Sequence, residues 1–446
     1  MNSEEHLRRI FRAALDAVQP AVLLAQSLLL EGESLVVRGG AGRFDLRGYE
    51  RLVVLGAGKA AAAMAAALER LLGERIDEGL VVVKDGYTAP LQRVRCLEAG
   101  HPVPDERGEA AAAALAGLAS KADERTLAIV LVSGGASALL PAPIAPLSLR
   151  DEQAVTRSLL SCGAEIGEIN CLRKHLSRLK GGRLVGLLGG ATVLSLILSD
   201  VVGDRLDAIA SGLTVPDPST YADALGIVRK YGLEIPNAAR EVLERGLRGE
   251  VEETPKPEDP RFARVSNVLV GSNRTGLEAA RSEAAALGYK PVILSSRIVG
   301  EAREVGKVYA AIALDQRRFR DLDPAGAPVC ILAGGETTVS VRGPGLGGRN
   351  QECALAFLAE LAAAGSAGEG IHFLAASSDG TDGPTDAAGA FASRAFLAKS
   401  RRLRLEPGAF LRENDSYRFF EKVGGLFRTG PTNTNVCDYQ ICLVTE

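Results

Sequence analysis

Residues 51–72 read RLVVLGAGKAAAAMAAALERLL, the pattern of a short apolar strand, a glycine turn and an Ala/Leu-rich helix. Similar apolar runs follow at Gly79 to Val83, Leu127 to Val132 and Thr192 to Leu198, with helical patterns between them. Continuous apolar strands that alternate with helices indicate a parallel sheet covered on both faces. The first half of the chain therefore predicts a Rossmann-like, mostly parallel α/β domain.

A charged stretch follows this half of the chain. Residues 248–261 read RGEVEETPKPEDPR, with three prolines and almost no large apolar residue, which is typical of an interdomain linker. Strands and helices alternate again after it, up to a final strand-like CDYQICLV. A chain of 446 residues is long enough for two domains. We expect an N-terminal domain over 1–252 and a second α/β domain over 262–446.

Charge and composition exclude several classes of protein. The net charge of −3 attracts neither nucleic acid nor an anionic membrane surface. The seven cysteines are scattered without a CxxC pair, so we expect reduced, mostly buried thiols in a cytoplasmic protein. None of the four histidines has a metal-binding spacing with a neighbour, which disfavours a zinc enzyme.

The apolar run Ala21 to Leu30 resembles a signal peptide only superficially. Glu4 and Glu5 make the leader acidic as well as basic, Pro20 interrupts it, and no small-x-small cleavage site follows. Ten residues are also too few to span a bilayer. We expect a pair of amphipathic helices here and no membrane association.

Glycine turns between a strand and a helix suit phosphate groups, because backbone N–H groups and the helix N-terminus face the anion there. The first such turn is GAGK, Gly56 to Lys59. It fits the GxGxxA form of the dinucleotide fingerprint but lacks the GxxxxGK of a Walker A loop. Lys59 places a cation at the mouth of this turn, although a tight turn with a solvated lysine would show the same pattern.

Two further turns share this arrangement. SGGAS, Ser133 to Ser137, follows the strand Leu127 to Val132, and GSNRTG, Gly271 to Gly276, follows a strand in the second half. Their hydroxyls and glycines allow close approach of the backbone to an anion, but a simple turn or helix start would also explain each of them. The candidate cofactor-binding residues in the three turns are Gly56, Gly58, Ser133, Gly134, Gly135, Ser137, Ser272 and Asn273.

Charged residues and amides follow other strands. The stretch Gly334 to Glu352 contains six glycines, with Glu336 after a strand and Arg349 at the start of a helix, and we expect it to serve function. SSDGTDGPTD, from Ser377 onwards, carries Asp379 and Asp382, which suit a hard cation or serve as turn caps.

Asp200 of LSDVVGD and Asn433 of GPTNTNV extend this set of polar residues. We expect all of these loops at the carboxyl ends of parallel strands, where open α/β sheets bind ligands. Cations, metal-binding carboxylates and a positioned hydroxyl are what phosphoryl transfer requires.

Ten motifs in this order resemble the glycerate 2-kinase family, whose C-terminal half is the MOFRL domain. They are VLGAGKAA, VSGGASALL, LSRLKGGRL, LSDVVGD, IASGLTVPDPSTYADA, GSN, GGETTV, GPGLGGRNQE, SSDGTDGPTDAAGA and GPTNTNV. The resemblance runs from about residue 6 to the C-terminus. It implies ATP- and Mg²⁺-dependent phosphorylation of D-glycerate, normally at the 2-hydroxyl, by a two-domain α/β enzyme with its active site in the cleft between the domains.

Carried over motif by motif, the family's catalytic residues fall on Lys59, Asp200, Glu336, Arg349 and Asn433, and its metal-binding loop on Asp379 and Asp382. By their chemistry, Lys59 and Arg349 would neutralise the transferring phosphoryl group or bind the glycerate carboxylate. Asp200 would orient or deprotonate the attacking hydroxyl, while Glu336 and the aspartates hold Mg²⁺. We expect alanine at Lys59 or Arg349 to remove most of the turnover without unfolding the protein.

Two alternatives remain. An NAD(P)-dependent hydroxypyruvate reductase would share the GxGxxA turn and a related substrate, but it has no need of the acidic loop, and no histidine lies in the motifs. A non-enzymatic sensor of sugar phosphates would need the anion turns without the acids. The residues leave open the 2- or 3-hydroxyl as acceptor, the nucleotide preference, a homodimer, and roles for the HPVPDERG loop and the RLKGGR turn.

Overall fold

The computed structural model describes residues 3–40, 42–322 and 326–445. The chain divides into two compact units. The parallel-sheet unit is Pro20–Val270, and the mixed-sheet unit is Met1–Gln19 with Gly271–Glu446. Each is named after its main sheet, and each is described by itself.

The division differs from the predicted boundaries at 252 and 262. Helix α1 (Ser3–Ala17) belongs to the mixed-sheet unit, because its buried face with Ile10 and Phe11 packs on α11 (Asn273–Ala286) and β15 (Asp438–Val444). The stretch 248–261 lies inside the parallel-sheet unit. The boundaries 1–252 and 262–446 stay a prediction for the functional domains.

The main sheet of the parallel-sheet unit has the strand order β6-β5-β4-β7-β8-β9. The strands are β4 (Arg51–Ala57), β5 (Glu78–Lys84), β6 (Val94–Ala99), β7 (Thr126–Val132), β8 (Thr192–Leu198) and β9 (Val265–Gly271). All pairings from β6 to β8 are parallel. Counted from β4, these five strands have the doubly wound order 3-2-1-4-5. The predicted Rossmann-like sheet is confirmed, and its order reverses between β4 and β7.

Both faces of this sheet are buried. β7 is buried at every position, as its continuous apolar run predicts. Helix α4 (Glu106–Ala119) shares a core with Val53 and Leu55 on one face, and α3 (Ala61–Leu72) buries Met64 and Leu68. The loops at the strand ends are therefore the parts of the sheet that ligands can reach.

A helical layer completes the parallel-sheet unit. It consists of α6 (Leu149–Ser161), α7 (Ile166–His175), α9 (Tyr221–Lys230) and α10 (Asn237–Leu247), which share a core of their own. Short helices α5 (Ala136–Leu139) and α8 (Arg183–Leu187), α2 (Pro20–Ser27) and a small sheet of β1 (Leu28–Glu31), β2 (Ser34–Val37) and β3 (Gly42–Asp45) make up the remainder. The predicted N-terminal helix pair is confirmed as α1 and α2. No helix in the described ranges is long and apolar enough to cross a membrane.

The mixed-sheet unit has the strand order β10-β11-β15-β12-β13-β14. Its other strands are β10 (Lys290–Ile298), β11 (Val329–Gly335), β12 (Ile371–Ser377), β13 (Gly389–Ser393) and β14 (Leu426–Phe427). β10 and β11 are parallel, whereas β15 runs antiparallel to both β11 and β12. The expectation that all site loops follow parallel strands is wrong here, because β15 begins where β11 and β12 end.

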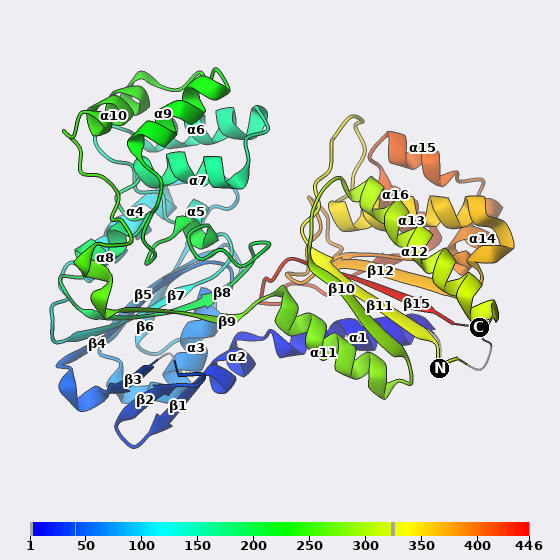
Figure 1. Ribbon diagram of the computed structural model, residues 1–446, viewed down its shortest axis with the longest axis horizontal. Coiled ribbons are helices and arrows are strands. Elements are labelled where there is room, and N and C mark those ends of the chain that lie inside the picture. Colours follow the sequence, from blue (N-terminus) through cyan, green and yellow to red (C-terminus); the bar gives the residue numbers. More distant parts are fainter. Residues whose placement is uncertain (1–2, 41, 323–325, 446) are drawn as a thin grey trace. The chain divides into compact units, whose positions relative to one another are not determined.

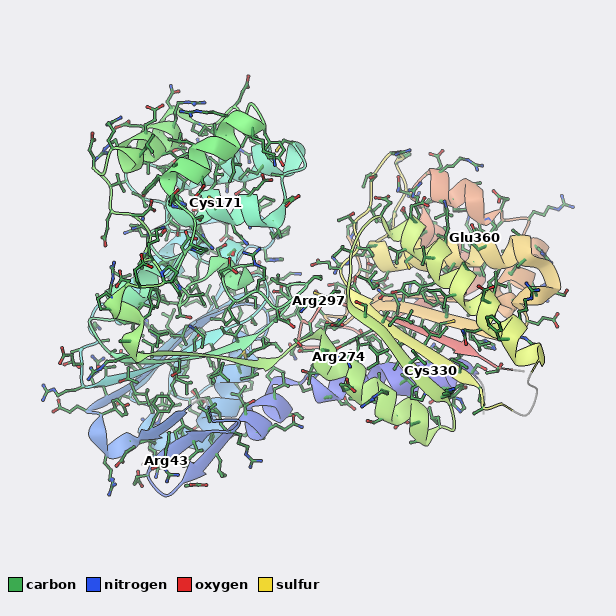
Figure 2. All side chains as sticks on the ribbon, viewed as in Figure 1. Arg43, Cys171, Arg274, Arg297, Cys330 and Glu360 are labelled. Carbon is green, nitrogen blue, oxygen red and sulfur yellow. The ribbon has the colours of Figure 1, made fainter. Side chains whose placement is uncertain are left out.

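Helices cover both faces of the mixed sheet. Figure 1 shows α1 and α11 on one side, and α12 (Ala302–Leu322) and α13 (Arg349–Ala364) on the other. Helices α14 (Arg394–Arg402), α15 (Pro407–Arg412) and α16 (Ser416–Val423) contact α13. All seven cysteines are unbridged and five are buried, as predicted; Cys171 on α7 and Cys330 on β11 are labelled in Figure 2.

Candidate functional site

The turns after β4 and β7 interlock at the point where the strand order reverses. Lys59 N–H donates to Gly134 O at 2.8 Å, and Ala60 N–H donates to the buried Ser133 Oγ at 3.0 Å. A Cβ on Gly58 would lie 2.2 Å from Ser133 Oγ, so only glycine fits. The two predicted glycine turns therefore form one structure.

This contact gives several candidate residues a packing role. A Cβ on Gly56 would lie 2.6 Å from Leu131 O, so this glycine lets β4 approach β7 closely. The Ser133 hydroxyl oxygen accepts a hydrogen bond from the turn before α3. The glycine turns are thus explained by the packing of two strands as well as by anion binding.

Lys59 and a histidine lie beside the second turn. Gly135 has φ 86°, and a Cβ on it would lie 2.9 Å from His101 Cδ2 and 3.7 Å from Lys59 Cγ. Both side chains are partly buried. No histidine lies within the motifs, but the HPVPDERG loop, whose role the sequence left open, brings His101 to the SGGAS turn. The only sequence signal was the position of that loop after β6.

Two further candidates belong to neighbouring loops of this unit. Asp200 follows β8, which pairs with β7, and its side chain is partly buried. Ser137 Oγ lies 2.8 Å from the buried Ser211 Oγ. Ser211 was not predicted as a site residue from the sequence, because IASG was considered only as part of a longer motif.

In the mixed-sheet unit, Arg349 joins two carboxylates. Its Nε and Nη2 donate to Asp438 at 2.6 and 2.9 Å, and its Nη1 donates to Glu336 Oε1 at 2.7 Å. Asp438 is fully buried, whereas the Glu336 side chain is 44% exposed. Asp438 begins β15 and pairs in register with both Gly335 and Ser377. The sequence analysis missed Asp438 because it opens an otherwise apolar strand.

The charge of Arg349 is stabilised by its two carboxylate partners. Burial lowers the pKa of Arg349, but the charges of Asp438 and Glu336 outweigh it and hold the pKa above its ordinary value. Arg349 is therefore neutralised within the protein, which argues against its predicted role of binding a carboxylate or phosphate by itself.

Asp382 caps a helix. Its carboxylate accepts hydrogen bonds from Asn350 N–H at 3.0 Å and Gln351 N–H at 2.8 Å, at the start of α13. Burial raises the pKa of Asp382 to about 6, against the lowering effect of these two bonds. A Cβ on Gly348 would lie 2.4 Å from Asp382 Oδ1, so Gly348 is required for this contact. The arrangement matches the turn-cap interpretation better than a metal ligand.

Asp379 and Asn433 lie in loops beside this cap. Asp379 Oδ1 accepts hydrogen bonds from Ser377 Oγ, Thr381 N–H and Thr381 Oγ1 at 2.9 to 3.0 Å. Asn433 is exposed, with φ 59°, in the loop before β15. The ends of β11 and β12 and the start of β15 thus bring these loops to one edge of the sheet.

The other two candidates have structural roles. Ser272 forms a capping box with Thr275 at the start of α11. Asn273 Nδ2 donates to Val436 O and Asp438 O, both at 2.9 Å, which ties α11 to the start of β15. Asn273 thereby contacts the backbone of Asp438, the residue whose carboxylate binds Arg349.

The glycine-rich loop before α13 also has a packing explanation. A Cβ on Gly343 or Gly345 would lie 2.5 or 2.3 Å from backbone atoms of Glu413. Asn414 Oδ1 accepts from the N–H groups of Arg342 and Gly343, and its Nδ2 donates to the buried Glu352. The glycine density therefore reflects close packing against the turn between α15 and α16.

No group of three or more His, Cys, Asp or Glu side chains suited to a metal ion occurs among residues 3–40, 42–322 and 326–445. Mg²⁺ needs fewer protein ligands than this, because it binds through one or two carboxylates, retained waters and substrate phosphates. Glu336, whose side chain is 44% exposed, offers a carboxylate of this kind.

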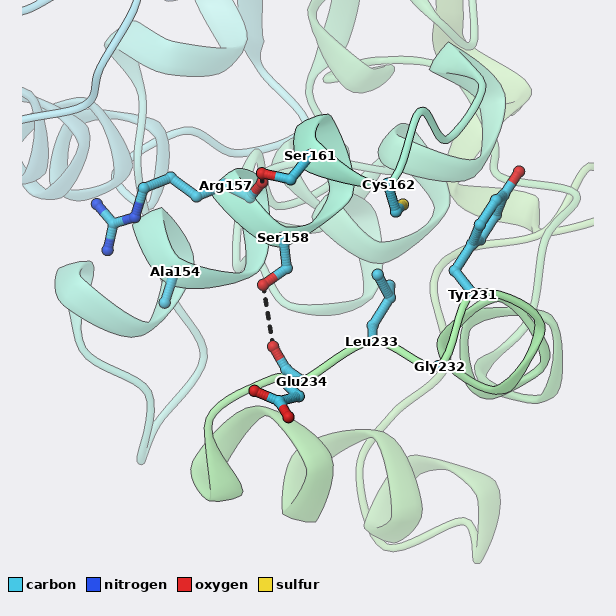
Figure 3. A pocket seen from close by; sticks show the side chains of 9 residues that line it. All are labelled: Ala154, Arg157, Ser158, Ser161, Cys162, Tyr231, Gly232, Leu233 and Glu234. Atoms are coloured by element: carbon cyan, nitrogen blue, oxygen red, sulfur yellow. Dashed lines mark hydrogen bonds between the residues drawn. The ribbon is translucent and has the colours of Figure 1, made fainter.

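The surface pocket in Figure 3 lies elsewhere. Its volume is about 480 Å³, and its wall combines α6 with the turn after α9, where Ser158 Oγ donates to Glu234 O at 2.9 Å. None of the predicted site residues lines it.

Comparison with known proteins gives the family. Residues 6–244 match the model "Domain of unknown function (DUF4147)", and residues 329–438 match "MOFRL family". The chain is 40% identical to Glycerate 2-kinase of Pyrococcus horikoshii over 98% of this chain and 96% of that protein. It is 41% identical to Putative hydroxypyruvate reductase of Agrobacterium vitis, over 100% and 95%.

A solved structure agrees with the sequence comparison. The crystal structure of glycerate kinase from Thermotoga maritima covers 99% of this chain, and this chain covers 99% of it, with 36% identity and a TM-score of 0.83. Sequence and fold are thus shared over nearly the whole length, and the chain belongs to the glycerate kinase family with DUF4147 and MOFRL domains.

Proposed function

We propose that this protein is a glycerate 2-kinase that transfers a phosphoryl group from ATP to the 2-hydroxyl of D-glycerate, with Mg²⁺, in the cytoplasm. The observation that carries the proposal is the position of Lys59, between two interlocked glycine turns where the order of a doubly wound sheet reverses. Ligands of such sheets bind at this crevice, and a lysine there can neutralise phosphate charge. The glycerate kinase relatives support the choice of substrate.

Each remaining candidate has a proposed task. Asp200, after the neighbouring strand β8, orients the attacking hydroxyl and takes its proton. Glu336 and Asp379 hold Mg²⁺, while Asp382 positions the start of α13 through its two backbone hydrogen bonds. Asn433 offers a neutral amide to the substrate. Bound Mg²⁺ supplies charge neutralisation on the phosphate oxygens.

The second candidate function is an NAD(P)-dependent hydroxypyruvate reductase. His101 beside the SGGAS turn could serve as a proton donor, and one relative carries that name with the word putative. However, the acid after β5 that would bind a nicotinamide ribose, Asp85, forms two hydrogen bonds of 2.7 and 2.8 Å with Arg107. We therefore favour the kinase.

A turnover assay separates the two functions. Purified protein with ATP and Mg²⁺ should release ADP only when D-glycerate is present, and it should not oxidise NADH or NADPH with hydroxypyruvate. Glycerate-independent ADP release, or hydride transfer without ADP, would contradict the proposal.

A further inference from the structure

Arg173 on α7 has no paired carboxylate in the part of the chain that the structure describes. Its side chain is partly buried, and no hydrogen bond or ion pair holds its guanidinium within the described residues. Burial lowers its pKa, and the nearby charge of Glu152 opposes this only in part. Glu152 is itself paired with the buried Lys180 at 3.0 Å. Since a buried guanidinium without a partner is costly, Arg173 is suited to an anionic ligand.

Two hydrogen-bonded paths connect the surroundings of Arg173 with the turn after β7. Asn170 lies one helical turn before Arg173, so both occupy one face of α7. Asn170 contacts Ser211, which contacts Ser137 at the start of α5. On the other path, Lys180 Nζ bonds both Glu152 and Leu140 O, just after α5. Arg173 therefore lies one helical turn from Asn170 and within reach of the charge of Glu152, the two residues that these paths link to the SGGAS turn.

The direction of the first path determines what Ser137 offers a ligand. Asn170 Nδ2 donates to Ala208 O at 3.2 Å, which leaves Asn170 Oδ1 to accept from Ser211 Oγ at 2.9 Å. A flipped amide would place two carbonyl oxygens together. Ser211 has only one hydroxyl proton, so the 2.8 Å bond to Ser137 uses the Ser137 proton. Ser137 can then only accept a hydrogen bond from a ligand.

The backbone around Ser211 holds this residue in place. Ala210 and Ser211 both have φ 53°, a left-handed conformation that costs energy in two consecutive non-glycine residues. Gly181 N–H donates to Ser211 O and helps to hold this turn. The Ser211 hydroxyl is thus fixed toward Asn170 and Ser137.

An acceptor oxygen suits a substrate hydroxyl and not a phosphate, because a phosphate needs donors. Ser137 is also a poor base, so the hydroxyl it contacts should be one that keeps its proton during phosphoryl transfer. The cationic partner for a carboxylate is then Arg173, since Lys59 is assigned to the phosphate charge and Arg349 already binds Asp438 and Glu336.

We propose that Arg173 and Ser137 form the subsite for the acceptor substrate, in which Arg173 binds the carboxylate of D-glycerate and Ser137 Oγ accepts a hydrogen bond from its 3-hydroxyl. This assignment rests on the proposed kinase function. It reassigns Ser137 from the nucleotide to the acceptor and adds a residue that no motif singled out.

The test of Arg173 compares Arg173→Met with Arg229→Met, a matched change of an exposed arginine on α9. The wild-type protein is assayed first, because its failure to phosphorylate glycerate would reject the function itself. With an active wild type, Arg173→Met should raise KM for D-glycerate about 10- to 100-fold and leave KM for ATP within about twofold. Arg229→Met should match the wild type.

Guanidinium rescue tests whether the effect is local. Millimolar guanidinium should restore glycerate turnover to Arg173→Ala but not change Arg229→Ala, with thermal unfolding followed in parallel. If Arg173→Met does not fold, Arg173→Lys provides the same comparison, with a smaller rise in KM for glycerate. A rise in KM for ATP instead of glycerate, or no change in either, overturns the assignment of Arg173.

A substrate analogue without the 3-hydroxyl tests the role of Ser137. D-Lactate lacks the 3-hydroxyl of glycerate but keeps its carboxylate and 2-hydroxyl. Inhibition of the wild type should show weaker binding of D-lactate than of glycerate. The variant Ser137→Ala should bind glycerate about tenfold more weakly than the wild type, while its affinity for D-lactate should be unchanged. Equal weakening of both ligands, or a change confined to ATP, would refute the contact with the 3-hydroxyl.

Discussion

Arg349 on α13 donates two parallel hydrogen bonds, of 2.6 and 2.9 Å, to the fully buried carboxylate of Asp438 on β15. The pair joins the first residue of a helix to the first residue of the strand at the centre of the mixed sheet. Bidentate pairs of this kind have a well-defined geometry as well as a favourable energy. Arg349 therefore supports the fold in addition to facing Glu336.

Replacing Arg349 should unfold a substantial part of the population, contrary to the expectation from sequence. Arg349→Met leaves the Asp438 carboxylate buried without a partner, which should lower the free energy of unfolding by about 3 to 5 kcal/mol. Urea titration measures the loss. The double variant Arg349→Met, Asp438→Asn should recover part of it, and a single variant as stable as the wild type would contradict the structural role.

Lys59 should behave in the opposite way, because its side chain is partly exposed at the mouth of a turn that backbone bonds hold. Lys59→Ala should lower kcat about 100- to 1,000-fold by removing charge stabilisation, with an unchanged unfolding curve. Lys121→Ala, on an exposed turn, is the control. Turnover by Lys59→Ala close to that of the control would reject the catalytic role.

The acidic residues of the mixed-sheet unit should separate into two groups. Asp382→Ala removes the cap of α13 and should lower the free energy of unfolding by about 0.5 to 2 kcal/mol. Glu336→Gln should instead raise the Mg²⁺ concentration for half-maximal turnover about tenfold or more, with little effect on stability. The reverse result, a Mg²⁺ effect for Asp382→Asn alone, would return the metal site to Asp382.

His175 and Glu253 should make stability depend on pH. Burial lowers the pKa of His175, but its hydrogen bonds with Cys171 and Glu253 raise it to about 9. Burial raises the pKa of Glu253, but the bond from His175 and two backbone N–H groups lower it to about 2. Each group therefore stabilises the protein only in the pH range where both partners are charged.

The sign follows from these values. The raised pKa of His175 contributes stability below pH 6.5, which is lost as the pH rises through about 9. The lowered pKa of Glu253 contributes stability above pH 4.5, and this stability is lost as the pH falls through about 2. Urea unfolding of the wild type should weaken from pH 6.5 to 9 more steeply than that of Glu253→Gln. Parallel profiles would show that the pair does not titrate in this way.

The parallel sheet was predictable from the sequence because its strands are continuous apolar runs between helices. The direction of β15 was not, because all seven of its residues are buried and burial on both faces leaves no alternation to distinguish parallel from antiparallel pairing. Asp438 was missed for the same reason, since it was counted as part of an apolar strand.

The sequence singled out candidate residues only where polar side chains stand next to a glycine turn. Lys59, Ser133 and Arg349 were selected in this way, and their roles stay predictions. Ser211 and Arg173 were not singled out, because they belong to a loop and a helix that only tertiary packing brings near other candidates. Ser272, Asn273 and the glycines before α13 have structural explanations in caps and close packing, which the sequence alone did not separate from ligand binding.

The most direct measurement is phosphorus NMR of the product formed from D-glycerate, ATP and Mg²⁺ by the wild-type protein. The proposed function predicts 2-phosphoglycerate together with ADP. Formation of 3-phosphoglycerate would keep a kinase but contradict the assignment of the 2-hydroxyl as acceptor. No phosphorylated product, with oxidation of NADH or NADPH by hydroxypyruvate, would contradict the kinase itself.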